Sequence, residues 1–552
     1  MAVPGAVTRA DRISDDNCDR AASVTTTASE QPAPAASDGN GAEFALLLSV
    51  FVVAACGLVY ELIAGALASY LLGDSVLQFS TVIGCYLFAM GIGSYLSRYV
   101  DNYLAENFIR IELLVGLIGG LMPAGLFLLH AYAPAPFRVA LYAAVLVIGI
   151  LVGLEIPLVM RILRRNYALK DLVSQVLTFD YLGALAVSIA FPLLLVPHLG
   201  LIRSGLLFGT MNAFVAGWAL WVFRRQLHWR RSLAAWSVLV MAVLLLAFAF
   251  AESITRLAED RFYGRKIVLA ESSPYQRIVL TEAGDVTRLY LNGNLQFSSR
   301  DEYRYHEALV HPVMLAHGAP RKVLVLGGGD GMAVREALKH ASVESVTLVD
   351  LDDRVTRLFS ERESLVALNG GALRSNKVQV VNADAFVWLE RNQSAFDVII
   401  VDLPDPTNYS IGKLYTTSFY QLLDRALAAS GYAVVQTTSP LHARQSFWTV
   451  VTTIEEAGLS TTPYHALVPS FGEWGYVVAH RRPWRTPQIE HAKWAAAAAP
   501  RGQALRFLTQ DTLVAMFQFP RDMQRVAAEP NRLNHQRLVQ LFEQEWGKAS
   551  SE

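Results

Sequence analysis

The stretch Lys322-Val-Leu-Val-Leu-Gly-Gly-Gly-Asp-Gly331 decides the fold of the C-terminal half of this 552-residue chain. Its first five residues are a short apolar run typical of a buried strand, and a helix is predicted from Met332 to His340. Glycines between a strand and a helix let the backbone approach a ligand closely, and the helix N-terminus presents unpaired N–H groups there. The sequence therefore predicts a ligand-binding unit of strand, loop and helix.

Further strands surround this unit. Four more apolar runs of strand length follow it, at residues 345–349, 377–381, 396–401 and 432–436. Because helical segments separate them, we expect a doubly wound, α/β Rossmann-like domain of the methyltransferase type over residues 311–483. Three shorter β-runs before the glycine loop predict a small antiparallel β-unit over residues 252–310.

Two aspartates indicate the class of ligand. Asp350 ends the second predicted strand, about twenty residues after the glycine loop, where a carboxylate accepts hydrogen bonds from a ribose hydroxyl. Asp330, inside the loop, would repel a pyrophosphate or an amino-acid carboxylate and would attract an ammonium group. Together, Asp350 and Asp330 favour an adenosine-like ligand that carries a positive charge near the loop. The alternative is that the loop is only a tight turn with a capping aspartate and binds no ligand.

Two more acids, Asp402 and Asp405, follow the strand 396–401. Ligands of open α/β sheets bind at the carboxyl ends of the strands, and paired carboxylates there can hold and deprotonate a cationic amine. The alternative is a turn before Pro406. The run 296–307 interleaves polar and aromatic residues and is a third candidate segment, or else a solvated helix start.

The N-terminal half has a different composition. Charged residues make up about 10% of positions 43–251 and about 22% of the positions from Glu252 onward, and only the second value is normal for a soluble protein. Seven apolar stretches each approach the roughly 20 residues that a spanning helix needs. They centre on 44–70, 76–97, 110–132, 138–160, 175–197, 201–222 and 233–251. We expect an α-helical, multi-pass membrane domain of about seven spans over residues 43–251.

Composition also excludes some functions and describes the chain ends. The formal net charge of −1 gives no support for nucleic-acid binding, which usually needs an excess of positive charge. The content of 53% hydrophobic residues excludes a mainly disordered chain. Three cysteines without metal-ligand spacing predict neither a disulfide framework nor a metal site. Residues 1–42 are predicted to be a disordered tail, and residues 484–552 a helical appendage.

Three acids lie inside predicted spans: Glu61, Glu155 and Asp180. Acids in lipid are expensive and are functional candidates by default. They are candidates for a cation pathway, and the alternative is interhelical hydrogen bonding by the protonated acids.

The glycine-rich segment 327–331, the run Arg300-Asp-Glu-Tyr-Arg-Tyr-His-Glu307 and the Asp402-x-x-Asp405-Pro406 pair occur in a familiar order and spacing. From Ala270 to Val478 the chain resembles the polyamine aminopropyltransferases, the spermidine synthases, and its apolar half is similar to their membrane-bound bacterial branch. The resemblance implies transfer of the aminopropyl group of decarboxylated S-adenosylmethionine to putrescine or a related polyamine. Methylthioadenosine would be released, and neither a prosthetic group nor a metal is implied.

The resemblance also implies roles for individual residues. Asp402 would accept the proton of the attacking amine. The donor would be bound by Gln276, Gln296, Gly327, Gly329, Asp330, Asp350, Asp384 and Ala385. The acceptor would be bound by Tyr305, His306 and Asp405.

Two departures from the family pattern lie on the acceptor side. Tyr409 stands where the family usually has a second proline, and Phe471 lacks the hydroxyl expected near the amine. Glu473 adds a carboxylate, and we hypothesise that it binds a further ammonium group, as a longer polyamine would offer. The identity of the acceptor amine therefore stays open.

Two other functions also stay open. A methyltransferase would share the sheet but must accommodate the donor's carboxylate, which Asp330 disfavours. A polyamine transporter or sensor would bind without turnover, which the intact Asp402 and His306 argue against. Soluble members of the family commonly associate, so a homo-oligomer is an open prediction for this chain.

The predicted orientation contains a conflict. Arginines between the fourth and fifth stretches, and between the sixth and seventh, place the N-terminus in the cytoplasm by the positive-inside rule. Seven crossings would then put the C-terminal half outside. The implied donor is made in the cytoplasm, so we expect a multi-pass protein of the cell (inner) membrane with a cytoplasmic catalytic domain, against the charge rule.

Overall fold

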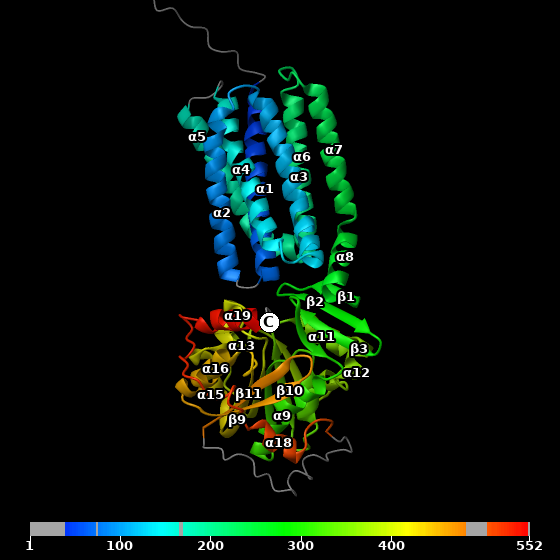
Figure 1. Cartoon of the computed structure of the whole chain (residues 1–552), viewed down its shortest axis with the longest axis vertical. Helices are drawn as coiled ribbons and strands as arrows, with labels where there is room; N and C mark the ends of the chain where they lie inside the picture. Colours follow the sequence, from blue (N-terminus) through cyan, green and yellow to red (C-terminus); the bar gives the residue numbers. More distant parts are fainter. Residues whose placement is uncertain (1–38, 73–74, 165–168, 482–504, 550–552) are drawn as a thin grey trace, which may run out of the picture. The chain divides into compact units, whose positions relative to one another are not determined.

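The computed structural model describes residues 39–72, 75–164, 169–481 and 505–549. Long apolar helices run side by side in its N-terminal region (Figure 1). They are α1 (Gly39–Leu72), α2 (Ser75–Leu96), α3 (Leu104–Tyr132), α4 (Phe137–Leu163), α5 (Leu169–Ala190), α6 (Val196–Val222) and α7 (Arg230–Ala249). Most of the predicted disordered tail, residues 1–38, lies outside the described residues, and α1 begins at Gly39.

Six helical segments of the described chain are long and apolar enough to cross a membrane, where the sequence predicted about seven. The difference lies in one candidate, Lys170–Val222, which contains two of the predicted stretches. The π-helical turn Phe191–Leu195 lies between α5 and α6, and the non-helical Gly200, with φ of 70°, kinks α6 near its start. The 53 residues of this candidate correspond to about 80 Å of helix, more than twice the ~30 Å hydrocarbon core of a bilayer.

Glycines set the closest approaches between these helices. A Cβ added to Gly93 of α2 would lie 2.0 Å from the carbonyl oxygen of Ile150 in α4, and one added to Gly153 of α4 would lie 2.2 Å from that of Met90. Small residues let membrane helices pack backbone against backbone. The pairing of α2 with α4 therefore depends on the absence of side chains at these positions.

An antiparallel sheet follows the helices, as predicted, but it has four strands where the sequence predicted three β-runs. Helix α8 (Ala251–Tyr263) leads into it, and its strands lie in chain order. They are β1 (Lys266–Ser272), β2 (Arg277–Ala283), β3 (Val286–Leu291) and β4 (Asn294–Ser298). The sequence analysis missed α8, whose Glu259 forms an ion pair of 2.8 Å with Arg277 of β2.

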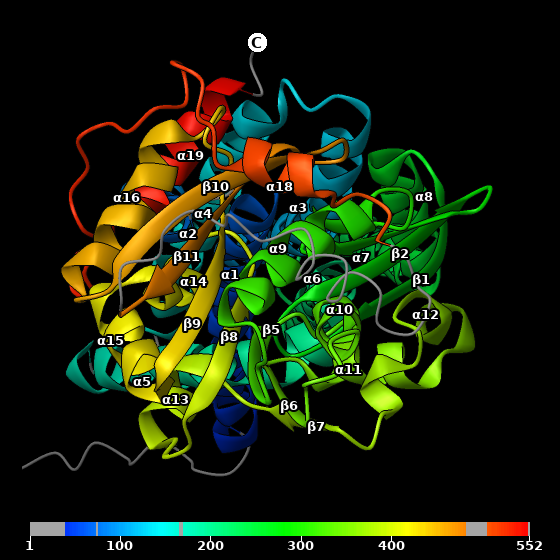
Figure 2. The same ribbon diagram turned by 90° about the horizontal axis from the view of Figure 1, so that it is seen from below.

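The second sheet has seven strands in the order β10-β11-β9-β8-β5-β6-β7 (Figure 2). They are β5 (Lys322–Gly327), β6 (Ser345–Asp350), β7 (Val378–Asn382), β8 (Phe396–Asp402), β9 (Leu427–Thr437), β10 (Ser460–Val468) and β11 (Gly472–His480). Strands β5 to β9 are parallel, and the hairpin β10–β11 adds antiparallel strands beside β9. The chain runs outward from β5 through β6 and β7 and then crosses to β8. The boundary between β5 and β8 is therefore the topological switch point, where such sheets bind ligands.

Both faces of this sheet are covered, which explains the continuous apolar run of β5. Val323 and Val325 pack into one apolar cluster, and Leu324 and Leu326 into another on the opposite face. The helices of this domain are α9 (Glu302–His317), α10 (Met332–Leu338), α11 (Asp353–Glu361), α12 (Glu363–Leu368), α13 (Ala385–Arg391), α14 (Tyr409–Gly412), α15 (Thr417–Ala426) and α16 (Arg444–Glu456). The predicted Rossmann-like fold is confirmed.

The described part of the predicted C-terminal appendage packs on this domain. It contains α18 (Gln510–Met516) and α19 (Arg537–Ala549), whereas residues 482–504 lie outside the described residues. The buried carboxylate of Glu307 in α9 accepts hydrogen bonds of 2.8–2.9 Å from three successive backbone N–H groups, those of Arg506, Phe507 and Leu508. This carboxylate ties the C-terminal segment to α9.

The glycine contact between α2 and α4 gives a first prediction. In Gly93→Ala, the new methyl group meets the backbone of α4, and such overpacking costs about 1–3 kcal/mol. Gly91→Ala, two residues away on the same helix, meets no atom within 4 Å and serves as the matched control. Thermal unfolding of the purified protein should show a lower midpoint for Gly93→Ala alone. Equal midpoints for the two variants would contradict this packing.

Candidate active site

Three strand ends bring the predicted site residues together at the switch point. Strand β5 ends at Gly327 and β8 at Asp402, and these two residues are partners in the parallel register. Strand β6, on the other side of β5, ends at Asp350. Gly327 has φ of 79°, and a Cβ there would lie 2.1 Å from the carbonyl oxygen of Asp402. Glycine at this position therefore lets the loop pass directly over the end of β8.

One side of the site is built around Asp350, which the sequence predicts to bind the donor. Its carboxylate accepts hydrogen bonds from the backbone N–H groups of Gly329 at 3.0 Å and Asp352 at 2.9 Å. Burial raises the pKa of Asp350 to about 6, although these two hydrogen bonds lower it. The N–H of Ala383 donates to the Asp350 carbonyl oxygen, 3.0 Å away, so the segment that leads to Asp384 and α13 lies beside this acid.

Gln276, in the turn between β1 and β2, reaches the same region from the antiparallel sheet. Its Nε2 donates to the buried carboxylate of Asp352 at 2.8 Å, and the Ser273 hydroxyl donates to the same oxygen at 2.7 Å. Sequence reasoning gave Asp352 no role of its own, although it lies in the acidic segment that follows β6. The structure assigns it to joining the two sheets and capping α11.

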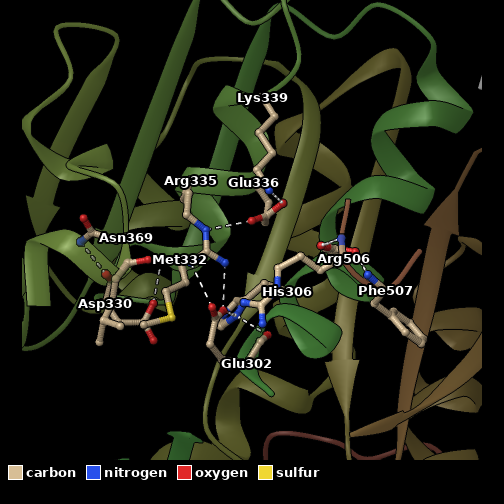
Figure 3. A network of polar contacts seen from close by, with 12 residues as sticks. Glu302, His306, Asp330, Met332, Arg335, Glu336, Lys339, Asn369, Arg506 and Phe507 are labelled. Carbon is tan, nitrogen blue, oxygen red and sulfur yellow. Dashed lines mark hydrogen bonds and ion pairs between the residues drawn. The ribbon is translucent and has the colours of Figure 1, made fainter. Parts of the chain in front are cut away.

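Asp330 lies in the glycine loop at the start of α10 (Figure 3). Its Oδ1 accepts a hydrogen bond from the N–H of Met332 at 2.9 Å, and its carbonyl oxygen accepts one from Asn369 at 2.9 Å. Burial raises the pKa of this carboxyl, whereas the positive charge of His306 opposes the rise. The capping turn considered as the alternative for this aspartate is therefore present, and the same carboxylate lies within electrostatic reach of His306 and Asp402.

A buried cation lies among these acids. The Nδ1 of His306 is 2.8 Å from Glu302 Oε2, and the same oxygen accepts a hydrogen bond from Arg335 at 2.9 Å (Figure 3). Burial alone would lower the pKa of His306, but the hydrogen bond and the charge of Glu302, with help from Asp330 and Asp402, raise it to about 9. His306 is therefore an imidazolium at neutral pH and donates to Glu302.

Glu302 and Arg335 received no role in the sequence analysis. Glu302 precedes His306 by four residues in the run 296–307, for which a helix start was one alternative, and this i, i+4 spacing is a signal that could have identified it. Arg335 lies on α10 and pairs with Glu302 across two helices, 33 residues apart in sequence. Because such a pairing depends on how α9 and α10 pack, the sequence held no comparable signal for Arg335.

Asp402 is the carboxylate at the centre of the site. Its Oδ1 accepts a hydrogen bond of 2.7 Å from the hydroxyl of Tyr305. Burial raises the pKa of Asp402 to about 6, His306 and Tyr305 hold it down, and the charge of Asp330 raises it further. A carboxylate with this pKa is mostly ionised at neutral pH and still basic enough to accept a proton in a reaction.

Asp405, predicted to bind the acceptor, follows Asp402 by three residues. Burial raises its pKa to about 7, although a hydrogen bond from Gln436 lowers it. Its Oδ1 is buried and has no hydrogen-bond partner among the described residues. Gln436 is itself fixed, because its Oε1 accepts a hydrogen bond from the indole of Trp474 at 3.1 Å. Because Gln436 is held in place, the Oδ1 of Asp405 has a fixed position. A ligand can donate a hydrogen bond to this oxygen.

Aromatic rings form a wall that begins at Tyr305, beside Asp402. The ring centroids of Tyr305 and Phe471 are 6.0 Å apart, those of Phe471 and Trp474 are 5.3 Å apart, and those of Trp474 and Trp546 are 6.3 Å apart. The indole of Trp546, in α19, donates to the hydroxyl of Thr438 at 2.9 Å. Aromatic faces attract ammonium groups. The C-terminal segment thus contributes a ring to the aromatic wall, which the sequence did not predict.

Two predicted donor-side residues make other contacts in this structure. The amide of Gln296 donates to the carbonyl oxygen of Asn294 on its own strand, 3.3 Å away. Asp384 caps α13, which begins at the buried Ala385, and forms an ion pair of 2.5 Å with Lys413. The structure therefore brings Asp384 and Ala385 beside Asp350, and it links Gln296 to none of the acids.

Glu473 is not brought to the acid cluster. Its carboxylate is 2.5 Å from Nδ1 of His465 on the neighbouring strand β10. The other ring nitrogen of His465 is 2.8 Å from the carbonyl oxygen of Gln518. Residue 473 lies on the opposite side of β11 from Trp474, because successive side chains of a strand alternate between the two faces of its sheet. The Glu473 carboxylate therefore has a partner within the protein, away from Asp405.

Comparisons with known proteins show which family this chain is similar to. Residues 302–487 match the Spermine/spermidine synthase domain family. The polyamine aminopropyltransferase 2 of Ralstonia nicotianae is 57% identical over 509 residues, which cover 91% of this chain and 98% of that protein. The polyamine aminopropyltransferase of Leptospira interrogans is 50% identical over 504 residues, which cover 91% of this chain and 99% of that protein. A crystal structure of spermidine synthase in complex with the transition state analogue AdoDATO matches this chain with 29% sequence identity and a TM-score of 0.42. The match covers 46% of this chain and 86% of the chain in that crystal structure.

The Rossmann-like sheet and the acids at its switch point define a group-transfer enzyme. With identities of this size over almost its whole length, the chain belongs to the polyamine aminopropyltransferase family. It is a transferase whose cosubstrate is decarboxylated S-adenosylmethionine, and the family uses no prosthetic group.

The pairing of His306 with Glu302 gives a second prediction. In Glu302→Gln the pKa of His306 falls, the imidazole becomes neutral, and Asp402 loses the cation that holds its pKa down. A carboxylate base works only when ionised, so activity is lost as pH falls through its pKa. The acidic limb of kcat/KM, expected near pH 6 in the unaltered protein, should move up by about one pH unit.

Methylthioadenosine release measured between about pH 5 and pH 9 reads out this limb. Glu344→Gln is the control, because Glu344 is exposed and pairs with Arg321. Its acidic limb should stay where it is. An acidic limb at the same pH in Glu302→Gln and in the unaltered protein would contradict the coupling between His306 and Asp402.

Proposed function

We propose that this chain is a membrane-embedded aminopropyltransferase that uses putrescine or a related polyamine as acceptor. The observation that carries the proposal is the setting of Asp402. Its carboxylate lies at the switch point beside the glycine loop, accepts a hydrogen bond from Tyr305, and has a pKa of about 6. Such a group can take a proton from an amine at neutral pH.

The donor would lie along the ends of β5, β6 and β7. Asp350 would accept hydrogen bonds from the ribose hydroxyls, and Asp384 with Ala385 would lie at the adenine. Asp330 would bind the aminopropyl ammonium, since its carboxylate lies in the loop that separates Asp350 from Asp402. Gln276 would approach the donor from the antiparallel sheet, as its contact with Asp352 supports. We retain Gln296 only as an expectation from the family, because it contacts Asn294 here.

The transfer step needs little from the protein besides positioning and a base. The neutral amine nitrogen of the acceptor attacks the aminopropyl carbon bonded to the sulfonium sulfur. The new C–N bond forms as the C–S bond breaks, and the electron pair of that bond leaves with sulfur as the neutral thioether of methylthioadenosine. Asp402 takes the proton that the amine must lose. Tyr305 orients Asp402, and the His306 imidazolium keeps it ionised until the proton transfers.

The acceptor would lie between Asp402 and the aromatic wall formed by Tyr305, Phe471, Trp474 and Trp546. Its far ammonium would meet the unpartnered Oδ1 of Asp405 and the ring faces. The contact of Glu473 with His465 gives no support to the hypothesis that Glu473 binds a further ammonium, so we leave it out of the acceptor site.

The apolar half supports attachment to the cell membrane. Six candidate spans lie between Leu48 and Ala249, and one of them is long enough for two crossings. We propose a catalytic domain on the cytoplasmic side, where the donor is made. The arginines around α4–α5 and α6–α7 favour the opposite side if α5 and α6 both cross.

The function is tested by supplying the purified protein with decarboxylated S-adenosylmethionine and a panel of diamines and longer polyamines. We expect release of methylthioadenosine with at least one amine, and a fall of about 10²–10⁴-fold in kcat for Asp402→Asn. Asp397→Asn is the matched control, because Asp397 lies on the same strand and accepts the backbone N–H groups of Arg321 and Lys322.

Release of methylthioadenosine by Asp402→Asn at the normal rate would contradict the role of Asp402. No release with any amine would contradict the transferase function and favour a sensor that binds polyamines without turnover.

A further inference from the structure

The helical region contains a cavity of about 160 Å³ between its helices. Side chains from α1, α2, α3, α4 and α5 line it, including Glu61, Tyr86, Glu155 and Asp180. A single water needs only about 10–15 Å³ of such space, so the cavity has room for a larger molecule. The three intramembrane acids that the sequence singled out therefore share one space, although they come from three helices.

One of these acids, Glu155, is buried and has a carboxylate oxygen that makes no hydrogen bond within the described residues. Glu155 is 1% exposed and lines the cavity, and its Oε1 has no hydrogen-bond partner among the described residues. Glu112 of α3, fully buried, interacts with it electrostatically, and neither of its carboxylate oxygens has a partner in the described part of the chain. A buried carboxylate without a partner is strongly disfavoured. A ligand that brings donors or positive charge into the cavity would relieve this cost.

The remaining lining narrows the kind of ligand. Apart from the three acids and Tyr86 it consists of apolar side chains and Gly57, and among the described residues no lysine, arginine or histidine lines the cavity. The described chain also contains no group of three His, Cys, Asp or Glu side chains placed to hold a metal ion. Separated acids on an apolar wall fit a flexible alkyl chain with ammonium groups along it better than one small cation.

We propose that this cavity is a second binding site for a linear alkyl polyamine, separate from the catalytic acids. Ammonium groups would pair with Glu155, Glu61 and Asp180, and the methylene chain would pack on residues such as Val53, Leu87 and Met90. The inference rests on the cavity of the helical region and does not depend on the transferase activity.

The test counts binding sites in the full-length, detergent-solubilised protein. Equilibrium dialysis with radiolabelled spermidine should find two equivalents bound per chain, one in each site. In Glu155→Gln the affinity of one equivalent should weaken by at least about tenfold, while methylthioadenosine release continues at the normal rate. Continued release also shows that this variant is folded.

Glu106→Gln is the control, because Glu106 is a buried acid of the same helical region that accepts the backbone N–H of His228 and does not line the cavity. It should bind both equivalents. Spermidine binding in Glu155→Gln that matches the unaltered protein in both number of equivalents and affinity would overturn the proposal. Failure of the transferase function is distinguishable, since it would appear as absent methylthioadenosine release whatever the number of sites.

Discussion

The ion pair between His306 and Glu302 is the constraint on which the catalytic site depends. Several carboxylates converge at the ends of β5, β6 and β8, and like charges so close together would otherwise favour protonation. A protonated histidine within their reach, held charged by Glu302, keeps Asp402 and Asp330 closer to their ionised forms. Arg335 in turn supports Glu302, so the cation that balances the acids is fixed by two helices.

This balance leaves the site with more negative than positive charge near the switch point. Asp330, Asp350, Asp402 and Asp405 face the region in which a ligand would lie, whereas Glu302 is occupied by His306 and Arg335. The excess suits a donor and an acceptor that both carry ammonium groups. The aromatic wall extends the same preference, because ring faces attract cations without adding charge that must be neutralised when the site is empty.

The sequence predicted the parts of this arrangement that depend on chain order and spacing. The glycine loop, Asp350, Asp402 and Asp405 follow strands, and parallel strands must bring their carboxyl ends to one edge. Contacts between distant elements were not predictable in this way. Arg335 reaches Glu302 only because α10 packs on α9, and Trp546 reaches Trp474 because α19 packs on α16, where the Glu545 carboxylate accepts the backbone N–H groups of Gln445 and Ser446. The contact of Glu473 with His465 was not predictable either, because the two residues lie on different strands.

In the helical half, too, the sequence predicted the elements but not the contacts between distant residues. Its apolar stretches follow from composition, but the meeting of Glu61, Glu155 and Asp180 in one cavity depends on glycine contacts that set the helix spacing. In both halves of the described chain, a buried carboxylate oxygen lacks a hydrogen-bond partner within the protein, that of Asp405 in the catalytic domain and that of Glu155 in the helical region.

The central claim is that the acid cluster around one imidazolium selects a donor with an ammonium group and no carboxylate. Calorimetric titration of the unaltered protein with decarboxylated S-adenosylmethionine, S-adenosylmethionine and methylthioadenosine tests it most directly. We expect the decarboxylated donor to bind at least about tenfold more tightly than S-adenosylmethionine, a difference of about 1.4 kcal/mol. Equal or tighter binding of S-adenosylmethionine would contradict the account, because its carboxylate would then be accepted beside Asp330.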